Sequence, residues 1–173
     1  RLLAIARTSG MRVVGPNCLG VVDTRSRLDA SFAPTFPPEG NVAIASQSGA
    51  IAIALIDQAA SRGLGIASVV SLGNRMDVSS NDLVEYWADD PGVAVIALYL
   101  ESFGNPRRFP EIARRVSRRK PIVVLKSGRS AVGMRAASSH SAALATNDLG
   151  VDALLASAGV TRVATIEELF DVV

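Results

Sequence analysis

From Asn41 onward, the chain alternates short, continuous apolar runs with segments of helical periodicity. The runs are rich in Val, Ile, Leu and Ala and occupy residues 42–45, 66–70, 93–100 and 122–125, with a last short run at 161–164. A continuous apolar run is typical of a parallel strand that is covered on both faces, because neither face meets water. Strand and helix in alternation therefore predict an α/β domain with a doubly wound parallel sheet.

The segments between the runs carry helix signals. Ser79 is an N-cap candidate with Asp82 three positions later, and Thr165 stands in the same relation to Glu168. Such capping boxes satisfy amide groups that the first turn of a helix leaves unpaired. Apolar residues spaced i, i+3, i+4 and i+7 mark a buried stripe on two later segments. The expected helices are residues 49–61, 80–88, 106–118, 148–158 and a final helix that follows Thr165.

The first part of the chain lacks this alternation. A helix-like stretch ends at Gly10, and a short apolar strand is expected at residues 11–14. We interpret residues 1–22 as the C-terminal remnant of a preceding domain. Residues 23–40 contain three prolines and show little periodicity, which is typical of a linker. The α/β domain is therefore expected to span residues 41–173.

Composition argues against several classes of function. Eighteen Lys and Arg against sixteen Asp and Glu leave a net charge of +2, and five Phe, two Tyr and one Trp are too few for a base-stacking surface, so no nucleic-acid partner is expected. No apolar run approaches the ~20 residues that span a bilayer, and no signal peptide is visible, so no membrane partner is expected. Cys18 is the only cysteine and His140 the only histidine, which argues against a metal site and for a reducing, cytoplasmic compartment.

Polar and small residues follow the predicted strands. In open parallel sheets, ligands bind beyond the carboxyl ends of the strands, so these residues are site candidates. The first run leads through a small-residue turn directly into an apolar helix, where free backbone N–H groups can approach an anion. The same turn can also be read as a serine N-cap with a close-packing glycine. Its residues are Ser46, Gln47, Ser48, Gly49 and Ala50.

His140 and Glu101 are the candidates for chemistry. His140 lies in a loop of small residues, where an imidazole with a free ring nitrogen can act as a nucleophile or base, or can simply be solvated. Glu101 ends an apolar strand. Its carboxylate can accept one ring N–H and make the other nitrogen more nucleophilic, or it can be an ordinary solvated acid at a strand end.

Four short motifs occur in order along the chain. They are Gly15-Pro16-Asn17-Cys18-Leu19-Gly20, the turn at 46–50, Ser71-Leu72-Gly73-Asn74 and Ser139-His140-Ser141-Ala142-Ala143-Leu144. Together with Thr165-Ile-Glu-Glu-Leu-Phe-Asp171 they resemble the NDP-forming (ADP-forming) acyl-CoA synthetases and the succinyl-CoA synthetase α-subunits. The resemblance covers nearly the whole chain. It implies a flavodoxin-like domain that follows a remnant of a Rossmann-like CoA-binding domain.

In that superfamily, acyl-CoA and phosphate yield an acyl phosphate and CoA, and the phosphoryl group moves to a histidine and then to a nucleoside diphosphate. The resemblance implies that His140 is the phosphorylated histidine, that Glu101 orients it, and that residues 46–50 bind the phosphoryl group. The residues that would border CoA and the acyl phosphate are Asn17, Cys18, Gly73 and Asn74.

The resemblance also implies partners that this sequence does not contain. CoA and ATP or ADP with Mg²⁺ would be bound mainly by CoA-binding and ATP-grasp domains of the same protein or of a partner subunit. None of these ligands is expected to bind tightly to residues 1–173, which alone should be inactive. The substrate would be a small carboxylic acid, and the full protein would be an oligomer.

A second interpretation stays open. The residues after His140 depart from the usual Thr and Gly, since Ser141 and Ala142 stand there. The context Arg135-Ala136-Ala137-Ser138 resembles protein lysine acetyltransferases in which this module is a ligand-sensing, regulatory part beside a fused acetyltransferase domain. In such relatives the histidine is often replaced, so its presence here favours the ligase.

Overall fold

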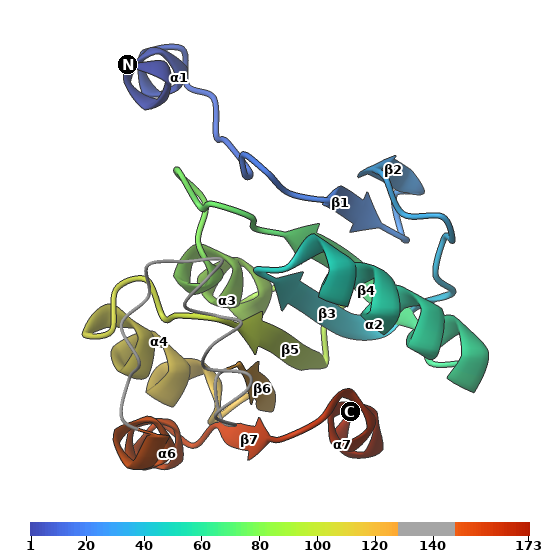
Figure 1. The fold of residues 1–173 in the computed structure, drawn as a ribbon, viewed down its shortest axis with the longest axis vertical. Helices are drawn as coiled ribbons and strands as arrows, with labels where there is room; N and C mark the ends of the chain where they lie inside the picture. Colours follow the sequence, from blue (N-terminus) through green and yellow to red (C-terminus); the bar gives the residue numbers. More distant parts are fainter. Residues whose placement is uncertain (128–147) are drawn as a thin grey trace.

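The computed structural model describes residues 1–127 and 148–173, which form one seven-stranded sheet with helices on both faces (Figure 1). The strand order is β2-β1-β4-β3-β5-β6-β7. The five strands from β4 to β7 pair in parallel, as predicted for a doubly wound sheet. Counted along the chain from β3, their order is second, first, third, fourth and fifth, which is the flavodoxin-like order. The parallel strands are β3 (Glu39–Ser46), β4 (Ile66–Ser71), β5 (Val95–Leu100), β6 (Ile122–Lys126) and β7 (Thr161–Val163).

The helices divide between two apolar cores, one on each face of the sheet. Trp87 and Phe109 are fully buried in the core beneath α3, α4 and α6, whereas Leu55 and Leu169 lie in the core beneath α2 and α7. This is why the parallel strands are continuously apolar: their side chains alternate between the two cores. The helices are α2 (Gly49–Arg62), α3 (Ser80–Ala88), α4 (Arg108–Val116), α6 (Asp148–Ser157) and α7 (Ile166–Val172).

The predicted caps are present. The Ser79 amide donates to the Asp82 carboxylate at 2.9 Å, and Ser79 and Asp82 form a capping box at the start of α3. The Glu168 amide donates to the Thr165 hydroxyl at 3.1 Å at the start of α7. Each cap satisfies an amide that the first turn would leave unpaired, so these helix starts were readable from short sequence patterns alone.

The N-terminal part departs from our prediction. Helix α1 (Leu2–Thr8) is formed, but the strand expected at residues 11–14 is not. Instead β1 (Gly20–Asp23) and β2 (Leu28–Ser31) form an antiparallel hairpin, and β1 pairs antiparallel with β4. Part of the predicted linker is therefore a strand of the sheet. The edge strand β2 is largely exposed, so it needs no apolar periodicity, which is the signal that the prediction relied on. The domain boundaries themselves stay a prediction.

Within the described residues, no helix combines the length and the apolar character that crossing a membrane requires.

Candidate functional site

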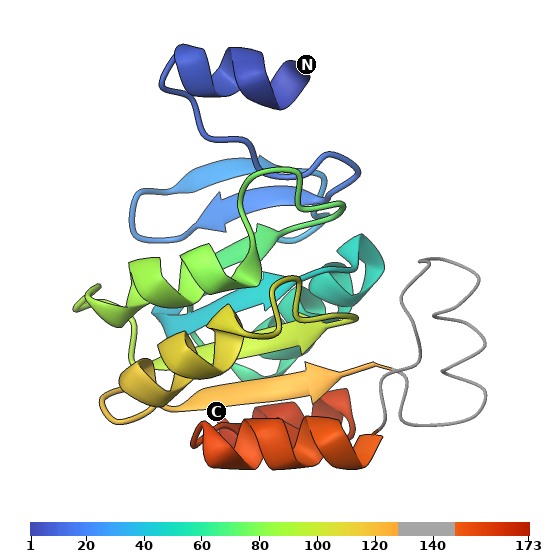
Figure 2. The same cartoon turned by 90° about the vertical axis from the view of Figure 1, so that its left-hand side faces the viewer.

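The candidate site lies at the edge of the sheet where the parallel strands end (Figure 2). Ser46 ends β3, Ser71 ends β4 and Leu100 ends β5. Because β3 lies between β4 and β5, the three loops that follow these strands meet at one edge. The sequence order alone does not give this arrangement, since β3 pairs with both the next strand and the one after it.

The turn from β3 into α2 ends in a capped helix start. The Ser48 hydroxyl accepts from the Ile51 amide at 3.3 Å, and the Ser46 hydroxyl donates to the Ser48 carbonyl at 2.7 Å. In the described part of the chain, the Gly49 and Ala50 amides have no hydrogen-bond partner. Amides of a first turn, together with the dipole of a 14-residue helix, attract an anion. Ser48 is thus the N-cap of α2, as the alternative interpretation expected, and the backbone N–H groups of Gly49 and Ala50 remain available as donors.

Gly49 lies next to the N-terminal segment. A Cβ at Gly49 would be 3.6 Å from the Leu19 nitrogen, which is ordinary van der Waals distance. Close packing among the described residues therefore does not require a glycine at this position. The alternative interpretation of the turn also expected a close-packing glycine, and this contact does not support that part of it.

Gln47 is occupied by the protein itself. Its side chain is 7% exposed. Its Nε2 donates to the Ser102 carbonyl at 2.7 Å, and its Oε1 accepts from the amides of Glu101 at 2.8 Å and Ser102 at 3.0 Å. Gln47 therefore ties the loop after β5 to the end of β3, and it fixes the backbone that carries Glu101. Direct binding of phosphate by its side chain stays a prediction.

Arg75 is the functional candidate that the sequence analysis missed. It follows Gly73-Asn74 in the loop after β4, has a positive φ of 53° and is half-buried. Its guanidinium donates to the carbonyl and the hydroxyl of Ser102, each at 3.1 Å. Burial lowers the pKa of Arg75, and the negative charge of Glu101 opposes that shift. The signal that could have found it is a cation directly after the Gly-Asn turn at a strand end.

Tyr99 on β5 is also partly buried near Glu101. Burial raises the pKa of Tyr99, and the charge of Glu101 raises it further. Both effects disfavour the phenolate, so Tyr99 is neutral at physiological pH.

The structure brings together three of the four residues assigned to the CoA side, Asn17, Gly73 and Asn74, and Cys18 follows Asn17 in the chain. The Asn17 side-chain amide donates to the Asn74 side-chain oxygen at 3.4 Å, and the Asn74 backbone amide donates to the Pro16 carbonyl at 2.9 Å. Gly73 has a φ of +50°, and a Cβ there would overlap the Asn17 carbonyl oxygen, so only glycine fits. The Cys18 sulfur lies 3.8 Å from the Val14 carbonyl oxygen.

His140 lies outside the described residues, so its position relative to the α2 N-terminus stays a prediction. Over residues 1–127 and 148–173, no group of three or more His, Cys, Asp or Glu could hold a metal ion.

Comparison with known proteins connects this geometry to relatives. The model of the succinyl-CoA ligase-like flavodoxin domain matches residues 39–173. The ADP-forming acetate–CoA ligase of Methanocaldococcus jannaschii is 43% identical over 173 residues, which is 100% of this chain and 24% of that protein. The α-subunit of ADP-forming acetate–CoA ligase I of Pyrococcus furiosus is 44% identical over 171 residues, which is 99% of this chain and 37% of that subunit.

Among solved structures, acetyl-coenzyme A synthetase 1 of Ca. Korarchaeum cryptofilum, described as dinucleotide forming and in complex with phosphate and ADP, matches with a TM-score of 0.92 and 41% identity. The match covers 98% of this chain and 37% of that chain. The chain thus spans between 24% and 37% of the length of these relatives. The family match over residues 39–173 agrees with the observed strand order. The chain therefore belongs to the family of succinyl-CoA ligase-like flavodoxin domains.

Proposed function

We propose that the chain is part of an ADP-forming acyl-CoA synthetase and that it carries the histidine that relays the phosphoryl group. The observation that carries this proposal is the edge where the first turn of α2 presents the Gly49 and Ala50 amides next to the loop that holds Glu101. The names of the relatives support the reaction class. The acetyltransferase interpretation receives no support from them.

The proposed reaction has three steps. Acyl-CoA and inorganic phosphate give an acyl phosphate and CoA. A ring nitrogen of His140 then attacks the phosphorus, and the carboxylate leaves with the electrons of the broken P–O bond. ADP finally takes the phosphoryl group, which forms ATP and returns the free imidazole.

The described residues of the site are assigned the following roles in this reaction. A phosphohistidine carries about two negative charges near neutral pH, as other phosphorylated side chains do. The helix N-terminus offers fixed donors for these charges without further ordering. The Glu101 carboxylate accepts the N–H of the second ring nitrogen, which fixes the tautomer that leaves the first nitrogen free to attack. Ser46 and Ser48 form the turn, and Gln47 holds Glu101 beside it.

The rest of the enzyme belongs to the proposal as well. Residues 1–22 would end a CoA-binding domain, and residues 23–40, which include β2 and the start of β3, would lead from it into the domain at 41–173. Asn17, Cys18, Gly73 and Asn74 would border the acyl phosphate. An ATP-grasp domain of the same protein or of a partner subunit would bind ATP or ADP with Mg²⁺, and the full protein would be a cytoplasmic oligomer. The small carboxylic acid that serves as substrate is selected largely by those other parts.

The test uses the full-length protein with its ATP-grasp partner. Incubation with γ-labelled ATP and magnesium should give an acid-labile, base-stable phosphoryl label. His140→Ala should abolish the label, whereas Cys18→Ala should keep it. An unlabelled wild-type protein whose ATP-grasp domain binds ATP would refute the relay.

A further inference from the structure

We propose that Arg75 is a positioning residue for Glu101: it reaches from the loop after β4 across the end of β3 and holds the Glu101–Ser102 segment beside the start of α2. The inference rests on the proposed function, because it concerns the same relay. Neither the sequence motifs nor the names of the relatives assign a role to Arg75.

The first argument is the hydrogen-bond geometry. The Ser102 carbonyl accepts two donors, Gln47 Nε2 at 2.7 Å and Arg75 Nη1 at 3.1 Å. Arg75 Nη2 also donates to the Ser102 hydroxyl at 3.1 Å. The planar fork of a guanidinium fixes two acceptors at once, which a single-point donor cannot do. Gln47 and Arg75 thus hold one peptide from two directions.

The second argument is the topology. Gln47 follows β3, Arg75 follows β4 and Glu101 follows β5, and the sheet order β4-β3-β5 places these three strand ends side by side. β4 and β5 do not pair with each other, and the Arg75 side chain connects their loops over the end of β3. The connection therefore lies at the site edge and not in the core.

The third argument is the environment of the guanidinium. Arg75 is half-buried, and its Nε is buried without a hydrogen-bond partner among the described residues. Burying a guanidinium and leaving one donor unpaired is costly, so a purely structural link would be served better by a neutral side chain. What the cation adds is a positive charge that the negative charge of Glu101 stabilises. Arg75 is therefore tied to the segment that carries Glu101 by electrostatic attraction as well as by hydrogen bonds.

Within residues 1–127 and 148–173, three charged or titratable side chains lie near this segment. Arg75 faces it from the loop after β4, Tyr99 lies on β5 itself, and Lys126 ends β6 opposite Leu100. Tyr99 is uncharged at neutral pH, and the Lys126 amine donates to the Ser127 carbonyl at 2.7 Å. Replacement of Arg75 therefore removes both the two hydrogen bonds to Ser102 and a positive charge near Glu101.

The experiment measures the initial rate of phosphoryl labelling as a function of ATP concentration, in the full-length protein with its ATP-grasp partner. Arg75→Gln loses both the charge and the fork, so its saturating rate should fall by about tenfold or more while the KM for ATP stays unchanged, as expected for a misplaced reacting group. Arg75→Lys keeps the charge but loses the fork, so its saturating rate should also fall about tenfold with an unchanged KM for ATP.

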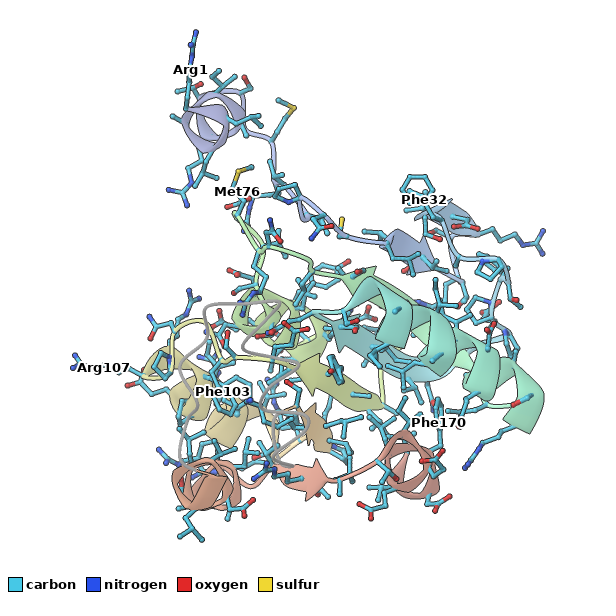
Figure 3. All side chains as sticks on the ribbon, viewed as in Figure 1. Arg1, Phe32, Met76, Phe103, Arg107 and Phe170 are labelled. Carbon is cyan, nitrogen blue, oxygen red and sulfur yellow. The ribbon has the colours of Figure 1, made fainter. Side chains whose placement is uncertain are left out.

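The matched control is Arg107→Gln, which removes the same charge from an exposed side chain that extends away from the molecule (Figure 3). Its saturating rate and its KM for ATP should match the wild type. Two results would overturn the inference: an Arg75→Gln variant with the saturating rate of the control, or an Arg75→Lys variant with the wild-type saturating rate. If Arg75→Gln does not fold, Arg75→Lys decides alone. An unlabelled wild type would refute the proposed relay and this inference with it, whereas a labelled wild type with an unchanged Arg75→Gln rate refutes only the inference.

Discussion

Gln47→Leu tests whether the Gln47 side chain holds the loop after β5. Leucine has nearly the volume of glutamine, so the change removes hydrogen bonds without opening a large cavity. Three bonds are lost: one to the Ser102 carbonyl, and one each from the amides of Glu101 and Ser102. The carbonyl keeps its bond from Arg75, so the two amides decide the cost.

The expected loss of stability follows from these two amides. Leaving a buried donor unpaired costs about 1–3 kcal/mol. Glu101 and Ser102 are only partly buried, so water compensates in part and each amide should cost about 1 kcal/mol, the lower limit of that range. The lost hydrogen bond from Gln47 to the Ser102 carbonyl adds a smaller net amount, so the free energy of unfolding should fall by about 2–3 kcal/mol in total. Urea unfolding should show this as a lower midpoint with an unchanged slope.

Gln58→Leu on α2 is the matched control, because the Oε1 of Gln58 is buried with no partner among the described residues and its side chain otherwise bonds only to the exposed Glu167 carboxylate among them. Its free energy of unfolding should change by less than about 1 kcal/mol. Equal losses in the two variants would show that water replaces the Gln47 bonds. The argument that Gln47 fixes the Glu101 segment would then be wrong.

Two further predictions concern the contact between the N-terminal segment and the loop after β4. Gly73→Ala should lower the free energy of unfolding by more than about 2 kcal/mol, because it adds a clash with the Asn17 carbonyl to the strain of a positive φ. The control Gly63→Ala has the strain but open space around it, so it should cost about 1–2 kcal/mol. Equal losses for the two variants in urea unfolding would contradict the clash. The hydrogen bond from Arg12 is the main cause of the lowered pKa of Asp77. The ionised Asp77 carboxylate therefore stabilises the folded state at any pH above the ordinary carboxyl pKa of about 3.9. This stabilisation is lost as the pH falls through the lower pKa that Asp77 has in the folded state. Asp77→Asn should therefore flatten the acid branch of the curve of stability against pH, and an unchanged acid branch would contradict this assignment.

The elements of the α/β domain were readable from the sequence because their signals are local. A buried strand is a short run of Val, Ile, Leu and Ala, and an amphipathic helix is a spacing that recurs along its own residues. The boundaries of β4 and α3 accordingly agree with the prediction to within one residue. Residues beyond the strand ends could likewise be chosen as site candidates from the strand positions alone, because ligands bind there in open parallel sheets, and their roles stay a prediction.

Tertiary structure alone decided how these pieces meet. The β1–β2 hairpin joins the sheet through backbone bonds to β4, and backbone bonds leave little trace in side-chain periodicity. The partners of Gln47 and Arg75 lie 54 and 27 positions away along the chain, across strands whose order the sequence does not state. The residues of this chain therefore determine which segments become strands, helices and turns. The pairing of distant strand ends decides which side chains share the site, because a contact between remote residues exists only once the sheet is assembled.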